Sequence, residues 1–310
     1  VHVVRPGETL ASIAQRYYGD PKRESVLVAE NGLTEQGGAA IVVGLRLVVP
    51  WVTYHVVQEG ERWNELAARF YGDPRRAFVL VDANDGTAGE QPDEGAEILI
   101  PYPLRHVAEQ GDTVTKVAQL YYEDHKAGRT LRRFNGIRGR RLTRGQIVLV
   151  PLQDLVLSEE GREAIEEETG RKPASGKIRE LQAQIDQKLP KLEEHLDEGR
   201  YAEALVLGNR LLGAGKLTGN QIVTIQRRLA TAYVALGRSD LAAQAFAEAL
   251  ARQPDMELDG MRSSPTVLSA FRQAKERIED RPKGEPKGEG EEGEGGEAEG
   301  DAGADVAGED

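Results

Sequence analysis

Hydrophobic positions follow two different rules along this chain. Up to residue 151, short runs rich in β-branched residues, such as residues 2–4 and 41–49, flank segments in which apolar residues recur at helical spacing. From residue 178 onward the helical spacing stands alone. The first pattern predicts short strands together with helices, and the second predicts an all-helical region.

The first 151 residues contain one pattern three times, in copies of about 50 residues. Copy 1 spans residues 2–50, copy 2 residues 54–101 and copy 3 residues 105–151. Glycines after the first strand recur 53 and 51 residues apart, and asparagines after the second helix repeat both spacings; they are Gly7, Gly60 and Gly111, and Asn31, Asn84 and Asn135. We expect each copy to fold as strand, helix, helix, strand, which makes this part of the chain α+β.

Local signals predict the element boundaries in copy 1. Thr9 is a suitable N-cap for the first helix, because its hydroxyl can accept a backbone N–H. The Gly-Asp-Pro sequence at residues 19–21 ends that helix, since proline cannot continue it. Asn-Gly at residues 31–32 ends the second helix, and a closing strand is expected over residues 41–49.

The three copies resemble the lysin motif (LysM). The resemblance lies in the His-Val-Val strand, the Gly-Glu-Thr-Leu turn at residues 7–10, the Tyr-Gly-Asp-Pro turn at residues 18–21, the Asn-Gly-Leu sequence at residues 31–33 and the closing proline. Copy 2 departs at Arg62, where the family favours threonine. Copy 3 departs at residues 122–125, Tyr-Glu-Asp-His, which puts the geometry between its helices in question.

The resemblance implies a carbohydrate-binding module that recognises polymers containing N-acetylglucosamine (GlcNAc), chiefly bacterial peptidoglycan and also chitin. It also implies a shallow groove between the loop after the first strand and the loop after the second helix, where backbone hydrogen bonds hold the acetamide groups. Glycine-containing loops suit such a close backbone approach. The implied glycan-binding residues are Gly7, Glu8, Thr9, Leu10, Asn31, Gly32, Leu33 and Ile41 in copy 1; Gly60, Glu61, Arg62, Trp63, Asn84, Asp85 and Gly86 in copy 2; and Gly111, Asp112, Thr113, Val114, Asn135, Gly136 and Ile137 in copy 3.

The same positions also have a structural interpretation, which the sequence leaves open. The glycines can serve turns alone, and Asn31 with Gly32 makes an equally good helix C-cap. Leu10, Trp63 and Val114 can belong to the core. If each site is weak, three sites on one chain gain through effective concentration on a polymer, provided that their spacing permits simultaneous contact.

The histidines His2, His55 and His106 do not indicate a metal site. They occupy the same strand position in three separate copies, whereas a zinc ion needs ligands that converge on it. We therefore expect neither a metal nor a cofactor.

The second half of the chain predicts packed helices. Residues 152–176 form a connector with one short helix between Ser158 and Gly170. A long amphipathic helix is expected over residues 178–196, with an antiparallel partner over residues 201–211. Residues 223–256 resemble the tetratricopeptide repeat (TPR) through Leu229, Ala230, Tyr233, Gly237, Ala242, Phe246, Ala249 and Pro254.

The TPR resemblance implies a short solenoid over residues 177–280. The pair of helices before residue 213 is a divergent copy, because Gly208 falls where a large residue is expected, and a helix after Ser264 closes the stack. Such a stack suits a docking surface for a protein whose identity the sequence does not give. The alternative is a rigid helical spacer without a partner.

Charge separates the end of the chain from the rest. The formal net charge is −12, and residues 281–310 contribute −8 of it through eleven acidic and three basic residues. This Gly/Glu-rich acidic tail should be disordered, because it cannot bury enough apolar surface. The remainder is close to neutral and is expected to lack a concentrated basic stripe, so nucleic acid is not an expected partner.

Composition excludes further classes. Without cysteine, these residues hold no disulfide, thiolate metal site or catalytic cysteine. No apolar run reaches the 18 or more residues of a transmembrane helix. The acidic residues fall mainly on expected solvent faces and in the tail, His125 and His195 are isolated, and no hydrolase motif occurs, so we expect no enzyme.

We therefore expect a non-catalytic adaptor of the bacterial cell envelope. Its LysM copies would hold peptidoglycan or another GlcNAc polymer, and its TPR-like domain would engage a protein. A periplasmic or surface location is expected, and the start at Val1 is compatible with removal of a leader. The leading alternative is an assembly scaffold whose LysM copies mediate protein packing and bind no glycan; a TPR chaperone for another envelope component is a third.

Overall fold

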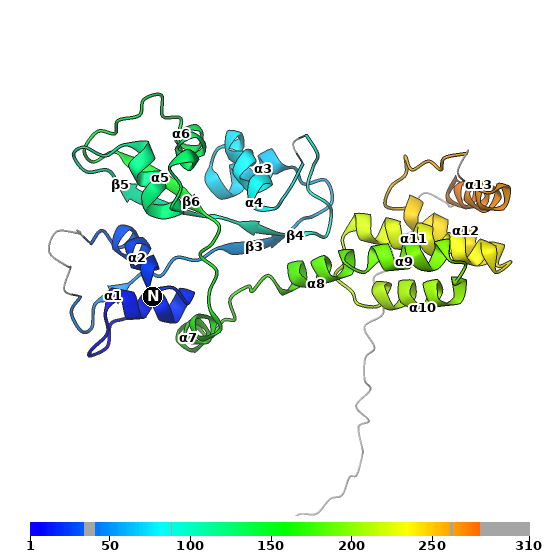
Figure 1. The fold of residues 1–310 in the computed structure, drawn as a ribbon, viewed down its shortest axis with the longest axis horizontal. Coiled ribbons are helices and arrows are strands. Elements are labelled where there is room, and N and C mark those ends of the chain that lie inside the picture. The colour runs from blue at the N-terminus through cyan, green and yellow to red at the C-terminus, as the bar shows by residue number, and fades with distance from the viewer. Residues whose placement is uncertain (34–40, 88, 261–262, 280–310) are drawn as a thin grey trace, which may run out of the picture.

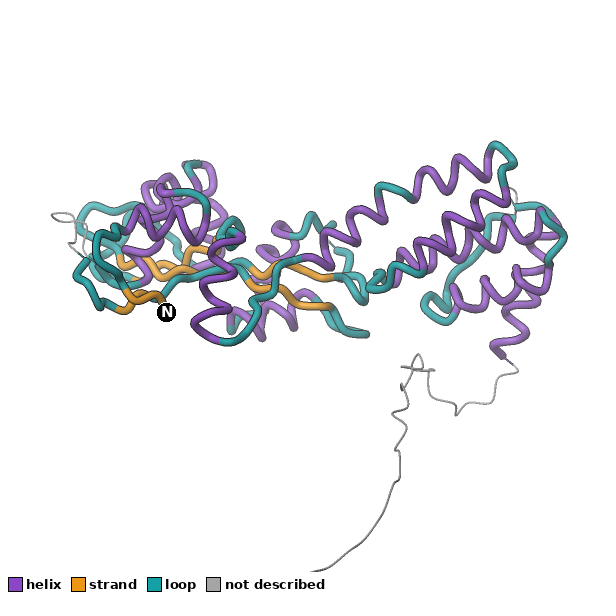
Figure 2. The backbone as a smooth tube through the Cα atoms, turned by 90° about the horizontal axis from the view of Figure 1, so that it is seen from below, coloured by secondary structure: helices purple, strands orange, loops and turns teal. Residues whose placement is uncertain are grey.

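The computed structural model describes residues 1–33, 41–87, 89–260 and 263–279. Three small units of strands and helices, which are the three copies, lie together in one body (Figure 1). A run of helices extends from one end of that body (Figure 2). The N-terminal part is thus mixed α+β with small sheets and the C-terminal part is rich in helices, as the sequence predicts; the expected tail, residues 281–310, lies outside the described residues.

Each copy pairs its two strands antiparallel and places two helices between them in sequence. Copy 1 contains β1 (His2–Val3), α1 (Leu10–Tyr18), α2 (Glu24–Glu30) and β2 (Arg46–Leu47). Copy 2 contains β3 (Thr53–Val56), α3 (Trp63–Tyr71), α4 (Ala77–Ala83) and β4 (Glu97–Ile100). Copy 3 contains β5 (Tyr102–Val107), α5 (Val114–Tyr122), α6 (Gly128–Asn135) and β6 (Ile147–Leu152). The register is also repeated, with His2 opposite Leu47, His55 opposite Ile98 and His106 opposite Val148.

The predicted closing strand of copy 1 is wrong in its length. Strand β2 covers only Arg46–Leu47 rather than residues 41–49. Gly44 has a φ of +88°, and the N–H of Leu45 donates to the carbonyl of Val42, so the chain turns just before the strand. Glycine adopts this conformation at little steric expense. The apolar run therefore includes a turn as well as a strand.

The turn between the two helices has the same geometry in all three copies. Gly19 and Gly72 adopt left-handed φ angles of +72° and +70°, and Glu123 in copy 3 adopts +54°. The next residue in each copy is an aspartate that caps a short 3-10 helix by accepting a backbone N–H two residues later; these are Asp20, Asp73 and Asp124. The sequence change at residues 122–125 therefore leaves the path between the helices of copy 3 unchanged.

Glu123 should be replaceable by glycine with a gain in stability. A left-handed conformation is strained for an L-residue, and the ion pair of Glu123 with Lys22, at 3.7 Å between exposed side chains, contributes little. We predict that Glu123→Gly raises the free energy of unfolding by about 0.5–1 kcal/mol in urea denaturation. Glu109→Gly, at an exposed position without left-handed φ, is the control and should lower it. A loss of stability in Glu123→Gly would show that the strain is negligible.

The three copies share their hydrophobic cores. Val26 of α2 is buried in one cluster with Leu104 of copy 3, and the hydroxyl of Tyr102 donates to a carboxylate oxygen of Glu30 at 2.7 Å. Phe134 of copy 3 is buried in the core of copy 2, with its ring edge-on to that of Tyr71 at 5.4 Å between centroids. The copies are therefore packed together rather than joined as separate beads.

The connector returns the chain to copy 1. Its helix α7 (Glu159–Thr169) begins after the N-cap Ser158 and ends at Gly170, as the sequence predicts. Gly161 lies so close to α1 that a Cβ atom there would stand 2.6 Å from the carbonyl oxygen of Tyr17. Ile165 is buried in the same cluster as the core residues of copy 1. Copy 1 is therefore completed by residues far along the chain.

The helical region contains α8 (Lys177–Asp186), α9 (Leu189–Asp197), α10 (Tyr201–Leu212), α11 (Gly219–Ala235), α12 (Ser239–Leu250) and α13 (Pro265–Glu279). The single long helix predicted over residues 178–196 is wrong, because the helix is interrupted at Gln187 and Lys188. Pro190 stands in the first turn of α9. Proline lacks the N–H that would continue a helix from the preceding turn, which explains the break.

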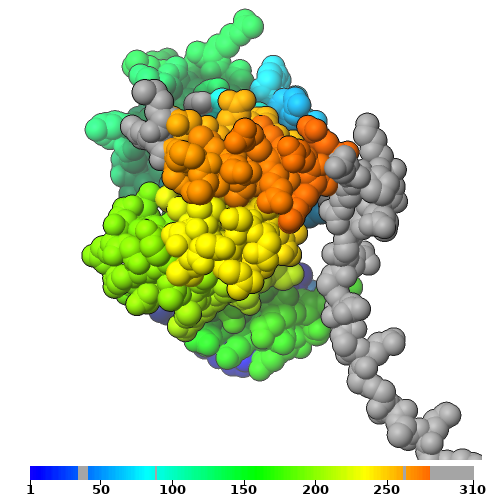
Figure 3. Space-filling view, turned by 90° about the vertical axis from the view of Figure 1, so that its right-hand side faces the viewer, coloured from blue at the N-terminus to red at the C-terminus, as the bar shows by residue number. Residues whose placement is uncertain are grey.

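The later helices stack in chain order. Gly208 lets α10 approach α11, since a Cβ atom there would lie 2.5 Å from a methyl carbon of Leu229. The ring of Phe246 in α12 lies edge-on to that of Phe271 in α13 at 5.3 Å. Figure 3 shows this end of the molecule, with α12 in yellow and α13 in orange lying against each other.

A buried glutamine fixes the helical region to copy 2. Gln182 of α8 is 5% exposed; its Nε2 donates to the carbonyls of Gly95 (2.8 Å) and Lys216 (2.9 Å), and its Oε1 accepts the N–H of Glu97 (3.1 Å). Gln221 of α11 donates to the carbonyl of Gln182 at 2.8 Å. Removal of this side chain would leave three backbone groups without their partner, at a junction that is only partly open to water.

Replacement of Gln182 by alanine should loosen this junction. We predict that Gln182→Ala lowers the free energy of unfolding by roughly 2–4 kcal/mol, because three backbone groups lose their partner. It should also speed amide hydrogen exchange at residues 93–97 and 216–221. Gln184→Ala, on the exposed side of the same helix, is the matched control and should change neither. Equal effects of the two substitutions would contradict this account.

Candidate functional site

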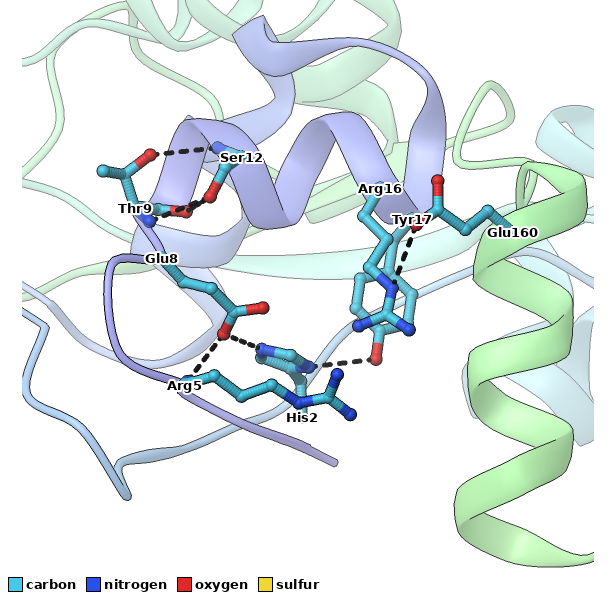
Figure 4. Close-up of polar contacts among 8 residues, drawn as sticks. All are labelled: His2, Arg5, Glu8, Thr9, Ser12, Arg16, Tyr17 and Glu160. Carbon is cyan, nitrogen blue, oxygen red and sulfur yellow. Dashed lines mark hydrogen bonds and ion pairs between the residues drawn. The ribbon is translucent and has the colours of Figure 1, made fainter.

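A histidine and a carboxylate fix the loop that follows the first strand. In copy 1, Nε2 of His2 lies 2.8 Å from Oε2 of Glu8, and the same oxygen accepts the N–H of Arg5 at 2.7 Å (Figure 4). Nδ1 of His2 lies 3.2 Å from the hydroxyl of Tyr17. The side chain of Glu8 is thus held within the loop rather than free to meet a ligand.

The other copies repeat this arrangement. His55 contacts Glu61 at 2.5 Å, and Glu61 also accepts the N–H of Gln58 at 2.9 Å. In copy 3 the histidine and carboxylate are farther apart, with 3.5 Å between His106 and Asp112. Each histidine therefore contacts its own copy's loop carboxylate, which accounts for its repetition on the first strand.

These contacts also set the acidity of the loop carboxyls. Burial alone would raise the pKa of Glu8, but hydrogen bonds from Arg5 N–H and His2 outweigh it and hold that pKa below its usual value. Burial, Gln58 and His55 act in the same way on Glu61, whose pKa is also lowered. Both side chains therefore favour the charged form, which preserves the loop hydrogen bonds at neutral pH.

The next residue on the loop caps the first helix in two of the three copies. Thr9 accepts the N–H of Ser12 at 3.1 Å, and Thr113 accepts the N–H of Lys116 at 3.2 Å. Arg62 occupies this position in copy 2 and makes no side-chain cap. The expected site residues Thr9 and Thr113 thus already have a structural role.

Threonine at position 62 should stabilise copy 2. A threonine N-cap satisfies a backbone N–H that arginine leaves without a side-chain acceptor, which is typically worth about 1 kcal/mol. We predict that Arg62→Thr raises the free energy of unfolding by about that amount, measured by urea denaturation. Thr113→Ala should lower it by a similar amount as the converse control. If Arg62→Thr proves neutral or destabilising, the cap is not limiting in copy 2.

An asparagine clamps the second helix to the closing strand in every copy. Nδ2 of Asn31 donates to the carbonyls of Leu27 (2.8 Å) and Val48 (2.9 Å), and its Oδ1 accepts the N–H of Val48 (2.7 Å). Asn84 makes the same three bonds with Leu80 and Leu99. Asn135 makes them with Leu131 and Leu149. The structural interpretation of these asparagines therefore applies, and their amides have little capacity left for a sugar.

A tyrosine at the end of the first helix completes the repeated framework. The hydroxyls of Tyr18, Tyr71 and Tyr122 donate to the carbonyls of the closing prolines Pro50, Pro101 and Pro151, at 2.7, 3.0 and 3.0 Å respectively. The three copies thus share the clamp and this bond.

The apolar residues among the expected site residues are partly or fully buried. Leu10, Leu33 and Ile41 of copy 1 are partly buried around one core cluster. Trp63 and Val114 are more deeply buried, at 7% and 1% exposure. Their side chains therefore belong mainly to the core, and a ligand would meet chiefly the backbone above them.

The two expected groove walls meet in copy 3. The N–H of Val114 donates to the carbonyl of Arg140 at 3.0 Å, and the N–H of Leu142 donates to the carbonyl of Asp112 at 3.1 Å. Thr113 and Arg141 form an isolated antiparallel bridge between the loops. The sequence interpretation missed residues 140–142; the signal was a single buried leucine, Leu142, within a run of arginines.

In copy 2 the loop after the first strand and the loop after α4 make different contacts from those in copy 3. The N–H of Trp63 faces the side-chain oxygen of Gln91 at 3.4 Å. The loop after α4 also contacts the helical region: Arg179 donates to Asn84 and lies 3.7 Å from Asp85, and the N–H of Gly219 donates to the carbonyl of Glu94 at 2.8 Å. In copy 1, residues 34–40 of the second wall lie outside the described residues.

The expectation that the chain lacks a concentrated basic stripe is wrong. Residues 126–144 contain eight basic residues and no acidic residue. Residues 102–152 carry a net charge of +6, residues 54–101 carry −6 and residues 2–50 are neutral. The net charge of residues 1–280 is close to zero because the positive charge of copy 3 and the negative charge of copy 2 cancel in the sum.

Comparison with known proteins agrees with part of this picture. The family model for the LysM domain matches residues 2–50 and 106–151. Two curated relatives from two strains of Mycobacterium tuberculosis, Esterase MT1326 and Esterase Rv1288, are each 30% identical over 136 residues, which are 44% of this chain and 29% of the relative. This chain thus spans less than a third of the length of those relatives. No solved structure matches.

No helix within the described residues is long and apolar enough to cross a membrane. LysM domains typically occur in proteins of the cell envelope or the extracellular space, and they are non-catalytic. Residues 2–50 and 106–151 thus match the LysM domain, which generally binds GlcNAc glycans such as peptidoglycan.

Proposed function

We propose that this chain is a non-catalytic adaptor of the bacterial cell envelope. It binds GlcNAc-containing glycan, chiefly peptidoglycan, through its LysM modules and a protein through its helical domain. The observation that carries the proposal is the match of residues 2–50 and 106–151 to a glycan-binding domain. In both segments the loop after the first strand is held in a fixed conformation, which suits recognition by backbone groups.

Copy 2 is proposed as a third LysM module. It has the same order of strands and helices and the same strand register. It also has the same histidine–carboxylate contact, asparagine clamp and tyrosine–proline hydrogen bond as the two matched segments. The proposed domains are the modules at residues 2–50, 54–101 and 105–151, the connector at residues 152–176 and the TPR-like domain at residues 177–280.

We propose that the glycan contacts the backbone of the groove walls. In copy 1 these walls include Gly7–Leu10 with Asn31–Leu33 and Ile41, and in copy 3 residues 111–114 with residues 135–137. The side chains of Glu8, Thr9 and Asn31 are already hydrogen-bonded within the protein. In copy 1, acetamide groups would therefore meet main-chain N–H and C=O groups, over a base made by residues such as Leu10. In copy 3 the N–H of Val114 and the carbonyl of Asp112 are bonded to residues 140–142, so a sugar would meet the remaining main-chain groups of these loops.

Two features support the proposal that the helical domain binds a protein: the close packing of its helices and a groove beside α13. Small residues at 230, 242 and 249 are fully buried where α11 and α12 meet, as the TPR resemblance implies. A groove beside α13 is lined by Leu258, Leu268 and Phe271 together with Arg272 and Lys275. Such a surface can receive a peptide or a helix.

An esterase and an assembly scaffold are the two alternative functions. The relatives' names include the word esterase, but the matched part is 29% of their length, so those names do not assign a reaction to this chain. The shared cores of the copies favour the second candidate, an assembly scaffold in which the modules serve protein packing and bind no glycan.

A titration of the full chain with chitotetraose, followed by NMR, tests the proposal. Saturable shifts should occur at the backbone amides of residues 7–10 and 111–114, while amides of α12 serve as the internal control. The full chain should also pellet with purified peptidoglycan sacculi, and chitotetraose should compete. The absence of both pelleting and shifts would reject glycan binding and favour the scaffold.

A further inference from the structure

Copy 3 carries a loop of arginines that have no partner among the residues that the structure describes. The arginine loop, residues 138–144, contains Arg138, Arg140, Arg141 and Arg144, and all four side chains are exposed. Within the described parts of the chain, none of the four has an ion pair or a side-chain hydrogen bond, although arginines elsewhere form several ion pairs. Four unpaired cations within seven residues repel one another, which favours a ligand that neutralises them.

The arginine loop is part of the groove. The carbonyl of Arg140 accepts the N–H of Val114, and Arg141 is bridged to Thr113, so the loop is anchored to the first wall. Lys116 of α5 donates from Nζ to the carbonyl of Gly111, which belongs to that first wall, at 3.0 Å. The arginine loop therefore borders residues 111–114, one of the two segments between which the family resemblance puts the sugar.

The corresponding loop of copy 2 has the opposite charge. Residues 86–95 contain Glu90, Asp93 and Glu94 and no basic residue. Part of that loop is bound within the protein, since Asp93 accepts the N–H of Asn220 and the carbonyl of Glu94 accepts that of Gly219. The two loops occupy equivalent positions, so the difference in charge distinguishes what each groove can receive.

We propose that the groove of copy 3 binds glycan through anionic groups on the polymer, carboxylates or phosphates, in addition to its neutral sugar face. The planar guanidinium group presents paired N–H donors that match both kinds of anion. The proposal rests on the proposed function, and it adds a substrate class: copy 3 prefers a charged cell-wall glycan to neutral chitin, whereas copies 1 and 2 have no such preference.

A nucleic acid fits this surface less well than a glycan does. Copy 2, with a net charge of −6, packs directly against copy 3 and would repel a long duplex. Single strands commonly bind by stacking their bases on aromatic side chains. The aromatic residues Tyr121 and Phe134 of copy 3 are buried, and Tyr122 is directed to the closing proline.

The test compares the full chain with two triple variants that lose the same charge. One carries Arg138→Gln, Arg140→Gln and Arg141→Gln. The matched control carries Arg171→Gln, Arg227→Gln and Arg277→Gln, which are exposed positions without an ion pair among the described residues. Binding is measured against intact sacculi, sacculi stripped of phosphodiester-linked polymers with hydrofluoric acid, and chitin beads, each at low and high salt.

We expect the arginine-loop variant to bind intact sacculi about tenfold more weakly at low salt, from the loss of three exposed charge contacts. Its salt dependence should be weaker than that of the wild type, its chitin binding should fall much less than its sacculus binding, and its melting temperature should be unchanged. The control should match the wild type. Wild-type binding to stripped sacculi that equals its binding to intact sacculi identifies carboxylates as the anions, and binding reduced to the level of the arginine-loop variant identifies phosphates.

Three results would overturn the proposal. They are equal sacculus binding by the two triple variants, a parallel loss of chitin binding in the arginine-loop variant, and tighter binding of the wild type to a 20-base-pair DNA duplex than to sacculi. If the wild type binds neither sacculi nor chitin, glycan binding itself fails. That outcome differs from one in which the wild type binds both sacculi and chitin and the arginine-loop substitutions change neither.

Discussion

An amide side chain at the end of the second helix holds each copy together. Two strands of two to six residues are only marginally stable alone, so the sheet has to be tied to a helix. Asn31, Asn84 and Asn135 do this by bonding both a helix carbonyl and the backbone of the closing strand. The residues that recur most faithfully are therefore structural.

Features encoded by neighbouring residues could be predicted from the sequence. The threonine cap at Thr9, the stop at residues 19–21 and the short helix between Ser158 and Gly170 are local, because each depends on a few adjacent residues and their backbone preferences. The copies themselves were visible as repeated spacings. Features that depend on distant parts of the chain, or on one overlooked residue, were not predicted.

Three residues show why the rest was missed. Val26 and Phe134 have the apolar character of core residues, but nothing in their spacing says that each is buried with a neighbouring copy. Pro190 divides a helix whose apolar periodicity continues across the break. The candidate groove was expected from the LysM resemblance, whereas the pairing of Thr113 with Arg141 arises only when the chain folds.

The contact between α7 and α1 has a consequence for the order in which parts of the chain fold. Gly161 lies against the backbone of Tyr17, and Ser158 donates its N–H to the carbonyl of Tyr17, across more than 140 residues of sequence. Contacts of such wide separation form late, because a long loop has to close first. During synthesis, which proceeds from the N-terminus, copy 1 would emerge before α7 exists. Of the three copies, copy 1 is made before copies 2 and 3, and its core is completed after theirs.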